Sequence, residues 1–565
     1  MIGMRTNSFE HQEHKTGASA GQSEVDVTEH GAVLRSAGTV GLITLLSRFS
    51  GYLRDMVIGY LLGTGMLADA WVAAFRLPNT LRRLVGEGNV SAAFVPVFAD
   101  ETRRRDQRRI WQLADSFHAA ILVAASGLML LGIAAAPWLV RSVLVPGFGA
   151  RAGAWDLTAH LARITFPYLL FISLSAALMA ILNARDRFAA PAFTPVLFNL
   201  ALIACALSLS GTLSSVNALA AGAIVGGFLQ WLFLVPFSWR LGMRFRLHLR
   251  LSDPAMRRIG LLMVPGLFGV GITQINVLVG QLLASFLRTG SISSLYYAGR
   301  LNELTLGVFA ISVATVVLPL MSRQAARGDR EQLVSTLNFA LRQVTLITLP
   351  AAVGLILLRS QIVDVLFQRG LFNSQSTDLT AAALWGYSCG LIGYAAVRII
   401  APAFYALKDT RTPVIVAAVA MVANVVGCLI LMQRFGHVGI ALANSLAGYL
   451  NTVLLLVLLR RKLGRVGLWR LTTSFLRLGV AAAVMGWVVS ALSGWWKPAS
   501  GAGLVTEVLV LAAVILVGVL TYLAAAAALR APELAELRSL VLHGKGGSGS
   551  EDRVPSPGNG RGRSR

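Results

Sequence analysis

Six arginines lie within stretches that are otherwise apolar enough to cross a membrane, namely Arg48, Arg54, Arg76, Arg82, Arg83 and Arg300. A charged side chain near the bilayer centre costs about 3 kcal/mol on insertion scales, so it usually faces a bundle interior or a wet cavity. Guanidinium groups form bidentate hydrogen bonds with phosphate oxygens. Several of them inside a membrane therefore indicate an anionic passenger, and they are suited to holding a diphosphate.

One predicted helix carries a line of alternating charges. Asp69, Arg76 and Arg83 are spaced seven apart and lie on nearly the same helix face, with Glu87 one turn beyond. The same helix is interrupted at Pro78 and by the glycines that flank Glu87. Interrupted helices expose backbone groups where transporters bind ligands. A packing kink is the alternative explanation of these breaks.

Some of the arginines have acidic neighbours that would neutralise them structurally. Arg48 and Asp55 are seven residues apart, and Arg300 and Glu303 are three apart. Pairing does not absorb the whole set, because the six arginines outnumber the four acidic residues of these helices. An excess of positive charge therefore remains for a ligand.

The composition is that of a polytopic membrane protein. Of 565 residues, 55% are hydrophobic and 13% charged, and the mean hydropathy is +0.67. Apolar runs of roughly 20 residues recur with short polar breaks, which predicts an all-α fold of about fourteen transmembrane helices. The predicted spans lie near 38–62, 66–99, 112–145, 157–183, 191–212, 216–239, 256–287, 291–322, 333–358, 377–406, 412–433, 438–460, 472–493 and 504–529.

The net charge of +24 fits the positive-inside rule rather than nucleic-acid binding. Basic clusters follow the even-numbered spans, whereas the odd-numbered loops hold few cations, so both termini are predicted to be cytoplasmic. Residues 1–35 read as a polar tail without a signal peptide. Residues 531–565 read as a disordered cytoplasmic tail, because Gly, Ser, Pro and Arg bury too little apolar surface to fold.

The two halves share short motifs in the same order, which predicts a parallel repeat. The matched pairs are 64–65 with 289–290, 74–77 with 298–301, 95–96 with 318–319 and 184–186 with 407–409. We therefore predict two six-helix lobes, the first over 36–250 and the second over 251–465, followed by a helix pair over 466–530. Chance similarity between apolar helices is the alternative.

Several runs are specific enough to suggest a family: 47–55 (SRFSGYLRD), 68–70 (ADA), 75–88 (FRLPNTLRRLVGEG), 92–96 (AAFVP), 296–301 (YYAGRL), 366–370 (LFQRG) and 401–405 (APAFY). Over roughly residues 36–530 the chain resembles the MurJ family, also called MviN, of bacterial lipid II flippases in the MOP superfamily. The resemblance implies that the two lobes surround a central cavity and that the last helix pair forms a groove for the polyprenyl tail.

Carried over by position, Arg54, Arg82 and Arg300 are implied to engage the substrate diphosphate. Other charged positions that matter in the family are matched by Arg48, Asp69, Glu87 and Arg398. Arg76 and Arg83, from the line of alternating charges, complete the set of predicted substrate-binding residues.

The implied activity is translocation of lipid II, the undecaprenyl-diphosphate-linked peptidoglycan precursor, from the cytoplasmic to the outer leaflet of the bacterial inner membrane. Alternating access is the implied mechanism, with membrane potential as the driving force and no cofactor. The expected partners are lipid II, membrane lipids and other cell-wall synthesis proteins. A flippase for another polyprenyl-diphosphate-linked oligosaccharide and a non-transporting cell-wall scaffold stay open as alternatives.

Two features depart from the family pattern. Gly299 stands where some relatives have an acidic residue, so an acidic partner for Arg300 must come from Glu303 or elsewhere. Some relatives bind sodium through membrane carboxylates, whereas spans eleven and twelve here offer Asn424 and Asn444 but no Asp or Glu. Histidines and cysteines are scattered without metal-ligand spacing, so neither a metal site nor a catalytic residue is expected.

Overall fold

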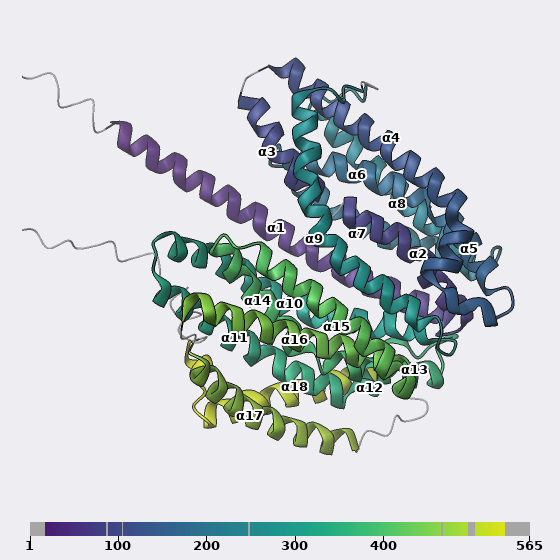
Figure 1. Ribbon diagram of the computed structural model, residues 1–565, viewed down its shortest axis with the longest axis vertical. Coiled ribbons are helices and arrows are strands. Elements are labelled where there is room, and N and C mark those ends of the chain that lie inside the picture. Colours follow the sequence, from purple (N-terminus) through teal and green to yellow (C-terminus); the bar gives the residue numbers. More distant parts are fainter. Residues whose placement is uncertain are drawn as a thin grey trace, which may run out of the picture. The chain divides into compact units, whose positions relative to one another are not determined.

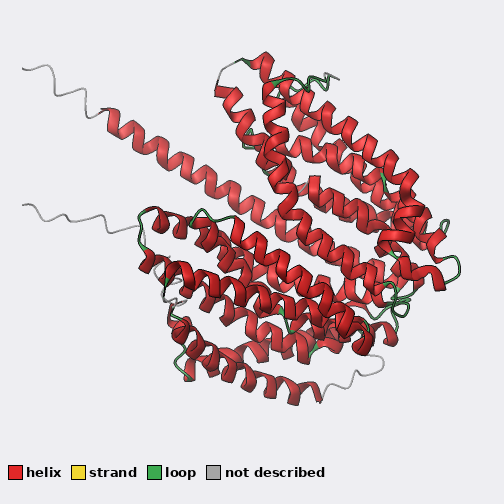
Figure 2. Cartoon of the chain, in the orientation of Figure 1, coloured by secondary structure: helices red, strands yellow, loops and turns green. Residues whose placement is uncertain are grey.

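The structure is a computed structural model that describes residues 17–85, 89–103, 106–246, 249–464, 467–494 and 503–536. These residues are almost entirely helical (Figure 2), which confirms the predicted all-α fold. The helices of Figure 1 are α1 (Gly17–Leu62), α2 (Met66–Val85), α3 (Asn89–Arg103), α4 (Gln107–Leu139), α5 (Ala154–Thr165), α6 (Pro167–Asn183), α7 (Ala189–Leu209), α8 (Ser215–Arg240), α9 (Pro254–Ala284), α10 (Ser291–Ala326), α11 (Arg330–Leu357), α12 (Arg359–Phe367), α13 (Ser374–Ser388), α14 (Leu391–Ala406), α15 (Arg411–Phe435), α16 (His437–Leu463), α17 (Leu468–Gly494) and α18 (Leu504–Ala528).

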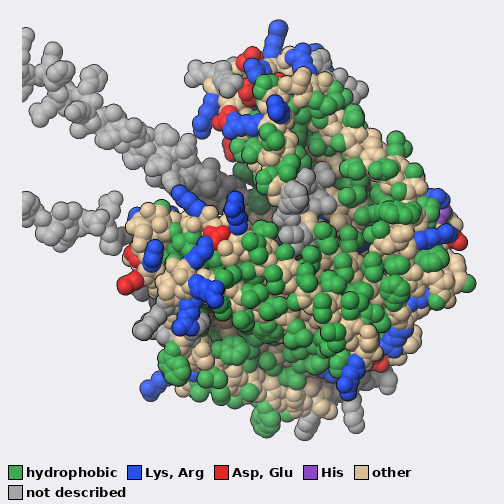
Figure 3. All heavy atoms as spheres, in the orientation of Figure 1, with side chains coloured by type: hydrophobic (Ala, Val, Ile, Leu, Met, Phe, Trp, Pro, Cys, Tyr) green, Lys and Arg blue, Asp and Glu red, His purple; other side chains and the backbone are tan. Residues whose placement is uncertain are grey.

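Nine segments of the described chain are long and apolar enough to cross a membrane, and α13 with α14 makes a tenth if that bent pair is one span. Figure 3 shows hydrophobic side chains gathered over the middle of the visible face, with many of the Lys and Arg side chains towards its edges. Helix α2 falls outside this set because its 20 residues include Asp69, Arg76, Arg82 and Arg83. The chain is therefore a multi-pass membrane protein, and the count of fourteen spans stays a prediction.

Three predicted spans each contain two helices. The span predicted at 66–99 holds α2 and α3, and the one predicted at 157–183 holds α5 and α6, with Pro167 as the first residue of α6. The span predicted at 377–406 holds α13 and α14, which are bent by 42°. Apolar length alone does not reveal these breaks, because a helix that restarts at once keeps the same hydropathy.

The chain divides into two compact units. The first consists of Met1–Arg300, Ser360–Gly386 and Ala417–Ala447, and the second of Leu301–Arg359, Tyr387–Val416 and Gly448–Arg565. In the first unit α6 packs against both α4 and α8, and a core of stacked rings forms where Phe94 of α3 meets Phe117 of α4 at 4.5 Å between ring centroids. The predicted lobe boundaries at 250 and 465 stay predictions.

In the second unit α11 packs against α14 and α17, and small residues let neighbouring helices approach closely. A Cβ atom on Gly393 of α14 would lie only 3.1 Å from the backbone of Gly448 in α16. Order continues past residue 531, where the predicted tail begins. Glu533 is fully buried. Its carboxylate accepts a hydrogen bond from the hydroxyl of Ser474 (2.5 Å), and Nη1 of Arg342 lies 3.7 Å from the same oxygen.

The last turns of α1 rest against the segment that follows α12. The backbone N–H of Leu371 donates to the carbonyl of Tyr60 (2.9 Å), and Phe367 and Phe372 pack against Gly59. Gly370 adopts a φ of +60°, and a Cβ atom there would lie 2.4 Å from the carbonyl oxygen of Tyr60. Only glycine fits this contact without moving the end of α1.

Replacing Gly370 with alanine is expected to destabilise the protein by about 1–3 kcal/mol, because the new methyl group meets backbone atoms and the left-handed conformation becomes strained. Gly354→Ala in α11 is the matched control, since nothing lies within 4 Å of a Cβ atom there. Unfolding of both variants in one detergent measures the difference. Equal stability of Gly370→Ala and wild type would contradict the contact.

Candidate functional site

A buried carboxylate between two arginines forms the centre of the candidate site. Asp55 Oδ1 accepts hydrogen bonds from Nε and Nη2 of Arg54 at 3.0 and 2.7 Å, and Oδ2 accepts one from Nε of Arg300 at 2.9 Å. The hydroxyl of Tyr296 donates to Oδ1 at 3.0 Å. Helix α1 supplies Arg54 and Asp55, α10 supplies Tyr296 and Arg300, and all four belong to the first unit.

A third helix, α7, orients Arg54. Nη1 of Arg54 donates to Oδ1 of Asn199 at 3.0 Å, while Nδ2 of Asn199 donates to the hydroxyl of Ser50 at 3.0 Å and to the carbonyl of Ser47 at 3.2 Å. The Asn199 amide is therefore used on both sides, which fixes its orientation. We call Arg54, Asp55, Asn199, Tyr296 and Arg300 the charged cluster.

The charged cluster carries a net positive charge, because two guanidinium groups share one carboxylate. The Asp55 side chain is 0% exposed, whereas the side chains of Arg54 and Arg300 are 14% and 29% exposed. The negative group is thus enclosed while the positive groups keep an accessible surface. Guanidinium groups with accessible surface are suited chemically to bonding phosphate oxygens.

Asp69 stabilises the beginning of α10. Its two carboxylate oxygens accept hydrogen bonds from the backbone N–H of Gly290 (2.7 Å) and from the backbone N–H and hydroxyl of Ser293 (both 2.8 Å). The Gly290 carbonyl accepts the first helical bond, from Ser294, so Asp69 caps the helix from outside its own segment. Asp69 is 0% exposed. In this structure its oxygens are used by α10, and a substrate contact of Asp69 stays a prediction.

The arginines of α2 have local polar neighbours. Nε of Arg76 donates to Gln281 of α9 at 2.9 Å, and Nε of Arg82 donates to Asn79 one turn earlier at 3.0 Å. Arg83 is half-buried on the same helix. On α2 the aromatic rings of Trp71 and Phe75 stack at 5.3 Å, so this helix combines an apolar wall with a line of cations.

Two of the remaining predicted residues, Arg48 and Arg398, lie on described helices. Arg48 is half-buried on α1, two turns before Asp55. Arg398 is half-buried on α14 and belongs to the second unit. Glu87 lies outside the described residues.

Sequence reasoning missed the polar partners of the arginines. Asn199, Tyr296 and Gln281 are neutral, whereas the predicted site residues were chosen for their charge. The available signal was their position, because a polar amide inside an apolar span is itself uncommon. The acidic partner that Arg300 needed is Asp55 of α1, which helix-face spacing within α10 does not indicate.

The described residues contain no group of three or more His, Cys, Asp or Glu side chains placed to hold a metal ion. Asn424 of α15 donates its amide N–H to the side-chain oxygen of Asn276 in α9 at 2.8 Å, so that oxygen is already used. A sodium site at these helices therefore stays an open question of the sequence analysis.

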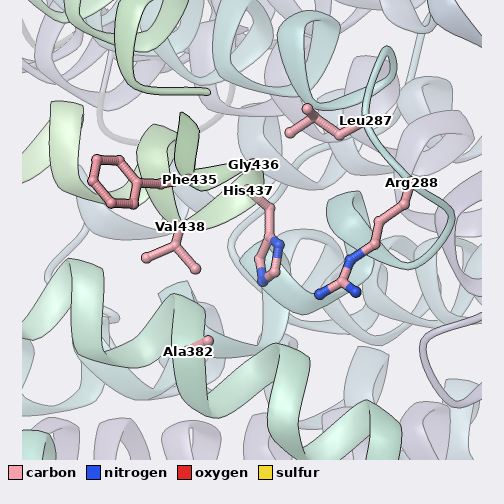
Figure 4. Close-up of a pocket in the computed structure, with 7 residues that line it drawn as sticks. All are labelled: Leu287, Arg288, Ala382, Phe435, Gly436, His437 and Val438. Carbon is pink, nitrogen blue, oxygen red and sulfur yellow. The ribbon is translucent and has the colours of Figure 1, made fainter. Parts of the chain in front are cut away.

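A cavity of about 320 Å³ lies elsewhere in the first unit, where the loop after α9 meets the start of α16. Figure 4 shows the Arg288 guanidinium and the His437 ring directed toward the same space. His437 is buried, and its Nε2 lies 2.9 Å from the carbonyl oxygen of Leu379. His437 thus has a structural partner at this helix connection.

Comparison with known proteins identifies the family. The sequence model described as "Lipid II flippase MurJ" matches residues 58–519. "Probable lipid II flippase MurJ" of Vibrio cholerae is 37% identical over 517 residues, covering 88% of this chain and 96% of that protein. "Lipid II flippase MurJ" of Burkholderia cenocepacia is 33% identical over 82% of this chain and 90% of its own length.

The chain belongs to the MurJ family. Among solved structures, "Lipid II flippase MurJ, inward closed conformation" matches with a TM-score of 0.72 and 27% identity, covering 89% of this chain and 99% of that one. An inward-facing multidrug resistance MATE transporter of the MOP superfamily matches with a TM-score of 0.61 at 15% identity, which shows a shared fold. The predicted family is confirmed, and it is a family of transporters rather than enzymes.

In this MurJ family member, replacing Asp55 with asparagine is expected to cost about 3–5 kcal/mol of stability, because two half-buried arginines lose a fully buried carboxylate that both of them contact. Asp156→Asn is the matched control. Its side chain is 82% exposed beside Arg141, so it should change stability by less than about 1 kcal/mol. Unfolding in one detergent measures both. Wild-type stability of Asp55→Asn would contradict the central role of the carboxylate.

Proposed function

We propose that this protein is a lipid II flippase of a bacterial cytoplasmic membrane, with both termini on the cytoplasmic side. Family membership supports the activity, and the alternation of basic loops supports the orientation. The observation that carries the proposal is the charged cluster. It keeps an accessible positive charge inside a membrane protein, and a diphosphate headgroup is an anion that needs such a charge to enter a low-dielectric region.

In the proposed mechanism the lipid tail stays in the bilayer while the diphosphate contacts Arg54 and Arg300. Arg82, Arg76 and Arg83 on α2 extend the cationic surface toward the sugar-phosphate region. The binding site is exposed alternately to the two sides of the membrane. No covalent step is needed.

Substitution of Arg54, Arg82 or Arg300 by alanine is expected to reduce lipid II exposure at the outer cell surface by about ten-fold or more, because each loses charge-assisted hydrogen bonds. The measurement uses cells in which this protein replaces the resident flippase, at matched membrane abundance. Arg187→Ala, in the exposed loop after α6, is the control. Wild-type protein that exposes no lipid II would overturn the proposed function. Exposure that survives all three substitutions would discard the site alone.

We further propose that membrane potential drives the transport. A potential that is negative inside favours outward movement of anionic charge by about 2.3 kcal/mol for each charge per 100 mV. Collapsing the potential with a potassium ionophore should therefore slow lipid II exposure, while collapsing the pH gradient alone should leave it unchanged. Exposure at an unchanged rate after loss of the potential would count against this driving force.

A further inference from the structure

A groove lies in the first unit between α4 and α8, and its lining contains no residue of the charged cluster. Helix α6 packs against both of these helices (Figure 1). The groove encloses about 330 Å³, within the range of about 300–1,000 Å³ typical of small-molecule sites. Its lining includes His118 and Leu122 from α4, Trp231 and Trp239 from α8, and Phe245 and Arg246 from the segment after α8.

Two buried polar atoms in this groove have no hydrogen-bond partner among the described residues. They are Nδ1 of His118 and Nε1 of Trp231. His118 as a whole is only 8% exposed. Leaving a buried polar atom unpaired costs about 1–3 kcal/mol. One is an indole donor and the other an imidazole nitrogen that accepts or donates according to its tautomer. A ligand with ester or hydroxyl oxygens would satisfy both.

The wall of the groove formed by the segment after α8 is held in a defined conformation. Phe245 adopts a φ of +49°, which is uncommon for a bulky residue, and its ring contacts His118 edge-on at 5.3 Å. Gly242, with a φ of +108°, turns the chain against Trp111, and Met243 is buried at 1% exposure. Packing on both sides of Phe245 therefore stabilises a strained residue at the groove.

Charge identifies the class of ligand. Arg246 lines the groove, and three further exposed arginines lie nearby in the sequence: Arg240 at the end of α8, and Arg244 and Arg250 after it. Tryptophan is enriched where a membrane meets water, and Trp239 is 61% exposed beside these cations. Apolar rings next to a cluster of arginines fit a molecule with an acyl chain and an anionic headgroup.

We propose that this groove binds an anionic phospholipid of the surrounding membrane. The acyl chain lies along Leu122 and the aromatic rings, and the phosphate contacts Arg246. Glycerol and ester oxygens are within the reach of Trp231 and His118. The site is formed by other helices than the charged cluster, so the proposal depends on the membrane location of the protein and is independent of the flippase activity.

The test measures thermal unfolding of the full-length, delipidated protein in dodecyl maltoside during titration with phosphatidylglycerol. Wild type should be stabilised, Arg246→Gln should need about ten-fold more lipid for the same shift, and Trp231→Phe about three-fold more. The matched controls, Arg187→Gln and Trp138→Phe, remove an exposed arginine and a 62% exposed tryptophan elsewhere and should titrate as wild type.

Two further probes separate the sources of the anion. Phosphatidylcholine should stabilise less than phosphatidylglycerol, and inorganic phosphate alone should have no effect. Identical titrations of Arg246→Gln and Arg187→Gln would overturn the proposal, as would equal effects of the two lipids. Stabilisation by inorganic phosphate alone would assign the groove to a soluble anion instead. Because Arg246 is exposed, its substitution leaves folding intact and the comparison stays interpretable.

Discussion

A carboxylate that cannot reach water must be paired, and in this protein the pairing of Asp55 organises the candidate site. Removing an ion from water costs several kcal/mol, and only well-placed opposite charges and hydrogen bonds offset that cost. Asp55 receives both from Arg54, Arg300 and Tyr296. Because these partners come from α1 and α10, the two helices must be held at a fixed distance and rotation. Two guanidinium groups thus meet at one carboxylate, and the proposed anion site is built on this arrangement.

The rest of the first unit explains how α10 keeps that position. Asp69 holds the first turn of α10 through three hydrogen bonds, nine residues before Arg300. Tyr297, fully buried beside Tyr296, packs its ring against Phe367 at 5.2 Å, in the segment that also contacts the end of α1. Residues from segments that are distant in the sequence thus contact α10 and hold it in place. They position the charged cluster without touching a ligand.

Much of this was predictable, and the missing part has a physical reason. The apolar runs predicted a membrane protein, and the arginines within them predicted a site for an anion, because the cost of inserting a charge depends on residue type and local sequence. The short motifs around these arginines predicted the family. The bonds of Asn199 and the capping of α10 by Asp69 join helices separated by more than a hundred residues. Helix-face spacing relates residues within one helix only. It therefore placed Asp69 in a line with Arg76, whereas the structure uses it to hold another helix.

In the proposed function, the positive charge of the charged cluster binds the diphosphate of lipid II. The most direct measurement is the affinity of purified protein for lipid II, comparing wild type with Arg300→Gln and with Arg187→Gln as a control of equal charge. The account predicts about ten-fold weaker binding for Arg300→Gln and no change for Arg187→Gln. Wild-type affinity in Arg300→Gln would contradict it.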